Sequence, residues 1–185
     1  MKKIILSAIA IMTIGFANAQ ETKFGLKGGL NIANVSGLSD SASLTSFHIG
    51  GVVEIKVSEK FSVQPELLYT AQGVKGNSNN SGSVELNYIA IPVMAKYYVA
   101  PKFALEAGPQ VAFNTAAKSV FGGNSVDIKE FVNSTDFSMN VGASFDVTDN
   151  FFAGVRYTAG LTKVFKDSQD SNKNNVFQIF VGYKF

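Results

Sequence analysis

Cysteine is missing from the 185-residue chain. Its absence excludes disulfide bonds and thiolate metal sites, and it excludes a lipoprotein, whose lipid is attached to a cysteine. Long apolar runs are also missing, because nothing after residue 19 approaches eighteen consecutive apolar residues. No transmembrane helix is therefore expected after that point, and a membrane-embedded chain would have to be a closed β-barrel.

An excess of charge of either sign is missing as well. The chain has 16 Lys and Arg against 14 Asp and Glu, and removing a leader that contains Lys2 and Lys3 would leave 14 of each sign. Nucleic-acid surfaces need clustered positive charge. We therefore expect no nucleic-acid partner.

Residues 1–19 have the pattern of a cleavable signal peptide. Two lysines precede an apolar run at 4–16, and the triplet Ala-Asn-Ala follows it. The run is shorter than the ~20 residues that a transmembrane helix needs, and an Ala-x-Ala triplet is typical of a cleavage site. We expect cleavage between Ala19 and Gln20, which leaves one outer-membrane β-barrel domain over 20–185.

The last nine residues, FQIFVGYKF, alternate between two faces. One face consists of five apolar side chains: Phe177, Ile179, Val181, Tyr183 and Phe185. Alternation with a period of two predicts a β-strand with one apolar face. A soluble protein would rarely leave such a strand bare, whereas in a membrane barrel it closes the sheet and faces lipid. We expect this strand to be read by the barrel-assembly machinery.

Seven earlier segments show similar alternation. The expected strands are 23–34, 47–57, 61–72, 84–99, 103–113, 136–147, 151–162 and 177–185. Short turns alternate with four long loops: 36–46, 73–83, 114–135 and 163–175. No helix after the signal peptide is needed, although the third loop could hold a short one. An even number of strands of this length and connection predicts an all-β, eight-stranded antiparallel up-and-down transmembrane barrel.

The apolar face of this barrel is expected to point outward into lipid. It carries most of the sixteen phenylalanines, and an eight-stranded barrel is barely wide enough to be filled by its own side chains. Glycines gather on the polar face, as suits a crowded interior. The alternative, a soluble lipocalin-like barrel, would place the apolar face inside.

Aromatic side chains at strand ends are expected to form two girdles at the membrane interfaces. The periplasmic girdle would consist of Phe24, Phe61, Tyr97, Phe103, Phe151 and Phe185. The outer girdle would consist of Phe47, Tyr69, Phe113, Phe137 and Phe177. Three prolines lie inside expected strands, and we interpret them as bulges or local breaks because proline removes a ladder donor; they are Pro65, Pro92 and Pro109.

Several motifs resemble a known family. QPELLYTAQG at 64–73, YIAIPVMAKYY at 88–98, ALEAGPQVAF at 104–113 and VRYTAGLT at 155–162 are similar to the small outer-membrane β-barrel family of Bacteroidetes, whose members are called PorT-like or porin-family proteins. Ala90 departs from the pattern, where the family often has an acidic residue. The resemblance implies an outer-membrane location and little about activity. A role in type IX secretion is not carried over, because fold-level similarity does not transfer function.

Charged side chains lie on the polar face of the expected barrel: Lys27, Glu54, Lys56, Glu66, Lys96, Glu106, Asp146, Arg156 and Lys184. The short turns place Lys96 opposite Glu106 and Glu54 opposite Gln64. Counting from these turns puts four residues at similar depth: Glu54, Glu66, Glu106 and Arg156. Because an unpaired enclosed charge is costly, we expect a structural network of six residues in the lumen: Lys27, Glu54, Glu66, Lys96, Glu106 and Arg156.

The sequence is compatible with three functions. The leading one is a structural or interaction protein with a largely filled lumen and four external loops. The second is a small-solute porin with a narrow ion path. The third is a lipid-modifying or proteolytic enzyme centred on His48, the only histidine, which should lie inside across from Thr70 with Ser46 and Asp40 close in sequence.

No enzyme motif supports the third reading, since a nucleophile elbow such as G-x-S-x-G is missing, and we expect no enzyme. We also expect no cofactor and no metal, because the loop at 166–175 lacks the spacing of a calcium loop. The expected partners are outer-membrane lipid and an unidentified extracellular or periplasmic protein.

Overall fold

The computed structural model describes residues 21–37, 41–76, 82–166 and 171–185. The expected signal peptide and its cleavage site between Ala19 and Gln20 lie outside the described residues, as does Asp40. Among the described residues, no helix is long and apolar enough to cross a membrane.

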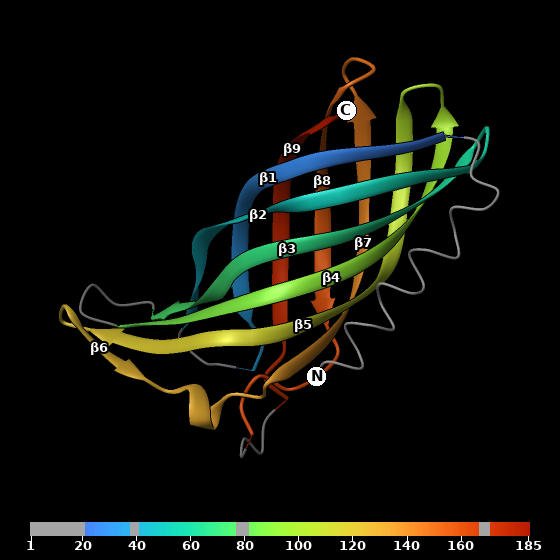
Figure 1. The fold of residues 1–185 in the computed structure, drawn as a ribbon. Coiled ribbons are helices and arrows are strands. Elements are labelled where there is room, and N and C mark those ends of the chain that lie inside the picture. Colours follow the sequence, from blue (N-terminus) through green and yellow to red (C-terminus); the bar gives the residue numbers. More distant parts are fainter. Residues whose placement is uncertain (1–20, 38–40, 77–81, 167–170) are drawn as a thin grey trace.

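The described chain forms a sheet of nine antiparallel strands (Figure 1). They are β1 (Glu21–Val35), β2 (Ser41–Ser58), β3 (Phe61–Gly76), β4 (Ser83–Ala100), β5 (Phe103–Phe121), β6 (Asn124–Asp127), β7 (Thr135–Asp146), β8 (Phe151–Gly160) and β9 (Asn174–Lys184). The sheet closes because β1 pairs with β2 on one side and with β9 on the other. The short strand β6 pairs with β5 alone and stands outside the ring. The predicted eight-stranded antiparallel barrel is therefore confirmed.

Connections of two kinds mark the two ends of the barrel. At one end, called the turn end here, short turns join β2 to β3, β4 to β5 and β7 to β8. The other end, called the loop end, carries the longer connections and the hairpin of β5 and β6 (Figure 1). The alternation of short and long connections expected from the sequence is confirmed.

The predicted loop over 114–135 is wrong in large part. Strand β5 continues through this segment to Phe121, turns at Gly122 and Gly123, and returns as β6. Both turn glycines have a positive φ, 56° and 83°, which a two-residue hairpin turn requires. A 3-10 turn, η2 (Lys129–Phe131), follows. The hairpin was not predicted because its second strand is shorter than the roughly ten residues of a membrane-spanning strand, although a Gly-Gly pair between extended residues is itself a hairpin signal.

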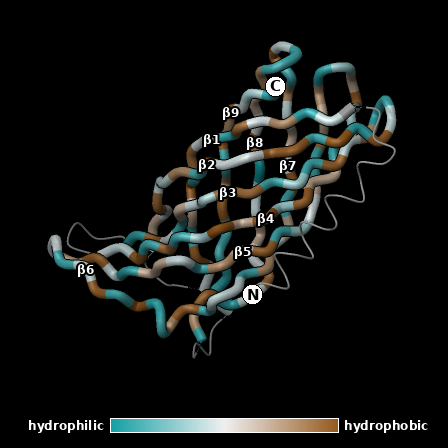
Figure 2. The backbone as a smooth tube through the Cα atoms, in the orientation of Figure 1, coloured by the Kyte–Doolittle hydropathy of each residue, from teal (hydrophilic) through white to brown (hydrophobic). Residues whose placement is uncertain are grey.

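Side chains alternate between the outside and the inside of the wall along each barrel strand. On β9, for example, the five side chains of the predicted apolar face are exposed, while Gln178, Phe180 and Lys184 are buried. Figure 2 shows the same alternation of apolar and polar residues along the strands. Apolar side chains thus cover the outside of the barrel and polar ones fill it, which is the arrangement of a membrane barrel and the reverse of a lipocalin.

The three strand prolines interrupt ladders without shifting the register. Pairing of β2 with β3 skips from Val52↔Glu66 to Ile55↔Val63 beside Pro65, and the register is the same on both sides. Equivalent gaps lie beside Pro92 in the β3–β4 pairing and beside Pro109 in the β4–β5 pairing. Each proline stays paired with the strand on its other side, as in Pro65↔Val93. The interpretation as local breaks fits, and the interpretation as bulges is wrong at these positions.

An apolar cluster lies inside the loop end of the barrel. It consists of Val35, Leu68, Val74, Leu86, Tyr88, Ala90, Ala112, Ala117, Val132 and Val164, all buried. Val132 follows η2, and Val164 comes from the β8–β9 connection, so external segments fold back over the interior. This cluster, called the apolar plug here, covers the polar interior from the loop end.

Candidate functional site: a charge network inside the barrel

Four charged residues meet at the middle of the interior and form what we call the Arg156 cluster: Lys27, Glu66, Glu106 and Arg156. Arg156 on β8 donates from Nη1 and Nη2 to the two carboxylate oxygens of Glu66, each at 2.8 Å. Its Nη2 and Nε also donate to Glu106 Oε1, at 3.1 and 3.3 Å. Lys27 Nζ donates to Glu66 Oε2 at 3.3 Å. Two cations therefore neutralise two carboxylates, and these side chains are at most 1% exposed.

A second neutral set, the Lys184 cluster, lies closer to the turn end and consists of Glu54, Lys96, Asp146 and Lys184. Lys184 Nζ donates to Glu54 Oε2 and Asp146 Oδ1, both at 2.9 Å. Lys96 Nζ lies 3.4 Å from Glu54 Oε2. The Tyr98 hydroxyl donates to Glu54 Oε1 at 2.6 Å.

Gln64 joins the two clusters. Its Nε2 donates to Glu66 Oε1 at 2.7 Å, and its Oε1 accepts from Lys96 Nζ at 3.2 Å. The described interior is therefore bridged by hydrogen bonds from β1 to β8 at one level and from β2 to β9 at the next. Charge-assisted and bidentate bonds of this kind are the strong ones in proteins.

Two inward phenylalanines fill the space beside these charges. Phe180 lies under Lys27 Nζ, 3.8 Å from the ring centroid, and Phe152 lies 6.2 Å from Phe180 between centroids. Their rings occupy the positions where Gly154 and Gly182 lack a side chain, since a Cβ on either glycine would meet a ring atom at 2.6 Å or less. Sequence reasoning left Phe152 unassigned, although it shares the face of Arg156, four residues along the strand.

The register predictions for the network have mixed outcomes. Lys96 lies opposite Glu106 and His48 opposite Thr70, as expected. The expectation that Glu54 lies at the depth of Glu66 is wrong. Glu66 faces Val52, so it stands one inward position farther from the turn than Glu54. Glu54 therefore belongs to the Lys184 cluster, together with Lys96.

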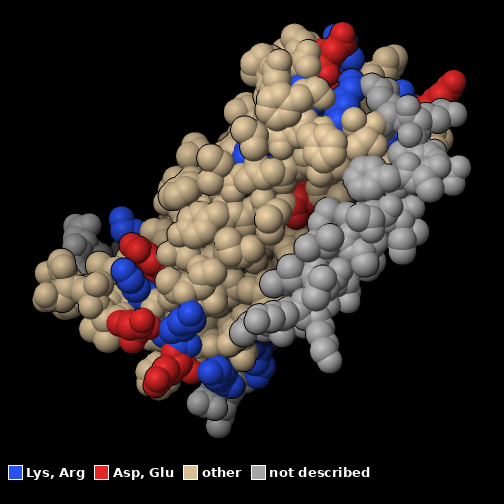
Figure 3. Space-filling model, viewed as in Figure 1, with Lys and Arg blue, Asp and Glu red and all other residues tan. Residues whose placement is uncertain are grey.

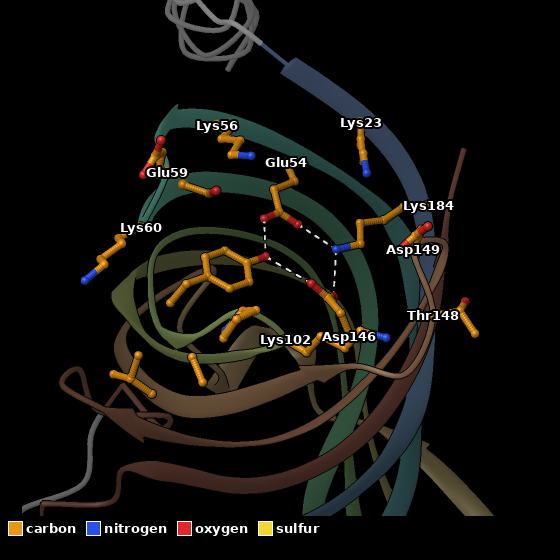
Figure 4. A pocket seen from close by; sticks show the side chains of 15 residues that line it. Lys23, Glu54, Lys56, Glu59, Lys60, Lys102, Asp146, Thr148, Asp149 and Lys184 are labelled. Atoms are coloured by element: carbon orange, nitrogen blue, oxygen red, sulfur yellow. Dashed lines mark hydrogen bonds and ion pairs between the residues drawn. The ribbon is translucent and has the colours of Figure 1, made fainter.

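The turn end opens into a cavity of about 690 Å³ (Figure 4). The Lys184 cluster lies at this cavity, because Glu54, Asp146, Lys184 and Tyr98 all line it. The exposed rim carries charges of both signs, including Lys56, which sequence reasoning placed on the inward face. The described residues that line the cavity include no member of the Arg156 cluster, whose side chains are buried.

His48 is buried and held by an amide rather than by a nucleophile. Its Nδ1 lies 2.8 Å from Asn31 Oδ1, and Asn31 Nδ2 donates to Thr70 Oγ1. The Ser46 hydroxyl donates to the backbone oxygen of Ala71 at 2.6 Å. Within the described part of the chain, no group of three or more His, Cys, Asp or Glu side chains could hold a metal ion.

Comparison with known proteins places this geometry in a family. The model of the outer membrane protein beta-barrel domain matches residues 17–166. The chain belongs to this family. No curated protein matches the sequence significantly.

Solved structures of the same fold include Neisserial surface protein A, with a TM-score of 0.58 and 18% identity over 89% of this chain and 97% of that one. Ail, the attachment invasion locus protein of Yersinia pestis, has a TM-score of 0.55 and 14% identity over the same shares of the two chains. A complex of Ail with the heparin analogue sucrose octasulfate has a TM-score of 0.53 and 13% identity, over 89% and 97%.

The protein is thus a barrel of the outer membrane. Short turns face the periplasm in such barrels and long connections face outward, so the turn end is periplasmic and the β5–β6 hairpin is external. On the face drawn in Figure 3, charged atoms gather toward the two ends and the wall between them is mostly uncharged. Aromatic side chains pair on the wall, Phe47 of β2 with Tyr69 of β3 at 6.0 Å and Phe151 of β8 with Tyr183 of β9 at 4.8 Å between centroids, and the two girdles stay a prediction.

Proposed function

We propose that this barrel serves as an anchor that presents its external segments, above all the β5–β6 hairpin, to a macromolecule at the cell surface. The observation that carries the proposal is the combination of a filled interior with an external strand pair. Arg156 and its partners occupy the middle of the lumen, and the apolar plug covers it from outside. The function of the molecule is then expected to reside in the segments that project from the barrel on the external side.

The hairpin has the chemistry of a contact surface. It carries exposed apolar side chains at Phe121 (60% exposed), Val126 (63%) and, just after it, Phe131 (64%). Strand β5 runs eight residues beyond Phe113 to Phe121, which is about 26 Å at ~3.3 Å per residue, so Phe121 and Val126, which pairs with Ser119, lie beyond the outer girdle. Exposed aromatic side chains with a polar surround are typical of interaction sites. The naming of Ail for attachment supports the same outward role by analogy of fold.

A photoreactive phenylalanine analogue at Phe131 tests this proposal in living cells. We expect crosslinked adducts with a surface macromolecule. The matched control is the same analogue at Phe137, an exposed side chain of the wall, which should crosslink lipid. Equal macromolecular adducts at both positions, or none at Phe131, would contradict the proposal.

Conductance separates this proposal from the porin alternative. The protein reconstituted in planar bilayers should give no steady current, because the Arg156 cluster closes the lumen with side chains that are at most 1% exposed. Discrete channels whose ion selectivity changes in Glu106→Gln would instead support a narrow pore. The enzyme hypothesis gains no support from the described structure, because His48 contacts Asn31 and the Ser46 hydroxyl donates to the backbone of Ala71. We therefore propose no activity assay for it.

The export route belongs to the same proposal. Cleavage after Ala19, insertion guided by the apolar face of β9, and membership of the PorT-like branch of Bacteroidetes barrels all rest on sequence patterns and motifs. Amino-terminal sequencing of protein isolated from outer membranes tests the first of these, with Gln20 expected as the first residue.

A further inference from the structure

Asp136 on β7 is a buried carboxylate that the charge network leaves out. Among the buried acids of the described chain, Glu54, Glu66 and Glu106 each have an ion pair within 3.4 Å. Asp136 is 7% exposed, has a side-chain hydrogen bond with Thr162, and is absent from the ion pairs of the described residues given above. The Arg156 and Lys184 clusters are each neutral by themselves, so no cation is left over from them. A buried carboxylate without a compensating positive charge is costly.

Three oxygen atoms without hydrogen-bond partners in the described structure line one small cavity beside this carboxylate. They are Asp136 Oδ2, Ser138 Oγ and Asn174 Oδ1. Ser138 is 4% and Asn174 is 3% exposed, so all three residues are more than nine-tenths buried. Buried polar groups without partners are rare in proteins, and each one needs an explanation.

Local structure brings the three side chains together. Asp136 and Ser138 are two residues apart on β7 and point to the same side of the wall. Ser138 pairs with Gly160 on β8. A Cβ on Gly160 would lie 2.4 Å from the backbone oxygen of Asn174, so the glycine leaves the room that Asn174 occupies.

The neighbouring bonds fix which atoms face the cavity. Asn174 donates from Nδ2 to Gln72 Oε1, which leaves its Oδ1 as an acceptor. Thr158, also at the cavity, donates its hydroxyl hydrogen to Asn140 Oδ1 at 2.6 Å, so its oxygen can only accept there. Acceptors at the cavity thus include a carboxylate, an amide oxygen and hydroxyl oxygens, beside the side chains of Gln72, Tyr88 and Gln110.

We propose that this cavity binds one hard cation, Na⁺ or Ca²⁺, held by Asp136, Ser138 and Asn174. Hard cations take carboxylate, amide carbonyl and other oxygen ligands of this kind. The cavity volume of about 10 Å³ is close to that of a single water-sized particle. A water molecule in the same place would donate two hydrogen bonds and leave the charge of Asp136 uncompensated, whereas a cation satisfies both needs. The ion stabilises the outer half of the lumen, between the Arg156 cluster and the apolar plug.

Refolding in defined salts tests the site. Protein purified from outer membranes is unfolded in urea and refolded in micelles in NaCl, CaCl₂ or N-methyl-D-glucamine chloride of equal ionic strength. A ligand that binds the folded state alone raises the folded-to-unfolded ratio by the factor 1 + [L]/Kd. We expect about a ten-fold rise at an ion concentration about ten times its dissociation constant, in the NaCl arm or the CaCl₂ arm, and the arm identifies the ion.

Three variants locate the effect. Asp136→Asn should abolish the ion-dependent rise, and the matched change Asp149→Asn, at an exposed residue of a periplasmic turn, should retain it. Ser138→Ala keeps the carboxylate and should weaken the rise, which preserves the test if Asp136→Asn fails to fold. Equal stability in all three salts overturns the proposal, and so does a full-sized rise in Ser138→Ala together with Asp136→Asn.

Discussion

Arg156 makes four of the hydrogen bonds that stabilise the interior of the barrel. Its guanidinium group donates to both oxygens of Glu66 and, from two nitrogens, to Glu106. A planar fork of five donors suits two carboxylates at once, which a lysine ammonium cannot match. Because all three groups are buried, the loss of Arg156 leaves two carboxylates with a single cation, Lys27.

Replacing Arg156 by Leu should therefore leave Glu106 without its ion-pair partner and Glu66 with Lys27 alone. Breaking a buried ion pair in this way costs about 3–5 kcal/mol, so we expect a lower urea midpoint and loss of heat-modifiability on gels at a lower temperature. Lys102→Leu removes a cation from an exposed turn and serves as the control. An unchanged midpoint in Arg156→Leu would show that the network does not hold the barrel together.

The residues of the interior could be predicted from the sequence, and their partners only in part. Alternation places Glu66 and Arg156 on the same face, and a short turn fixes Lys96 opposite Glu106. Arg156 and Glu66, however, are 90 residues apart and lie on strands that are not neighbours. Contacts across a barrel depend on strand tilt and stagger, which no local pattern contains. The group around Asp136 was missed for the same reason.

Among the elements, β9 contributes to both the apolar outer wall and the charge network inside. Its outer side chains, including Tyr183, and Phe185 directly after it cover the wall, while Lys184 completes the cluster inside. The backbone N–H of Phe185 donates to the oxygen of Phe24 at 2.7 Å, so the end of the chain is fixed to the first strand. The position and faces of this strand could be read from nine residues. The extension of β5 could not, because it continues past the membrane where no lipid-facing pattern is required.

Replacing Tyr183 and Phe185 by Ser should reduce the amount of folded protein in the outer membrane. The change removes the aromatic end of β9 from the periplasmic interface and leaves the buried network untouched. Fractionation followed by heat-modifiability gels gives the folded fraction, and Phe121→Ser in the external hairpin serves as the control. Equal folded fractions in the two variants would speak against recognition of β9 during assembly.

For the whole molecule, lipid acts as the solvent of the outer wall. The exposed side chains of the wall strands are mostly apolar, and they cover the outward faces of neighbouring strands such as β7 and β8. In water such a surface would drive aggregation. In a bilayer the apolar wall contacts lipid tails, and the polar side chains form hydrogen bonds and ion pairs inside the barrel.

A charge should therefore be tolerated outside the membrane and rejected within it. Val155→Arg places a charge on the wall beside the middle of the barrel, where Arg or Lys costs about 2–4 kcal/mol. Val126→Arg places the same charge on the external hairpin, at a side chain of greater exposure, and should cost little. Folding free energies from urea titration in lipid vesicles measure both. Similar costs at the two sites would mean that the membrane boundary lies elsewhere.

The pairing of β1 with β9 closes the barrel, and both strands supply cations that neutralise interior carboxylates. Lys184 is 130 residues from Glu54, and Lys27 of the first strand shares Glu66 with Arg156 of the eighth. An open sheet that lacks β8 and β9 would hold Glu66 with Lys27 alone and Asp146 without its lysine. Partly assembled forms therefore carry unbalanced charge toward the low-dielectric interior. We therefore expect closure of the ring and neutralisation of its contents to occur together, and we expect a half-assembled barrel to remain open to water and to proteases.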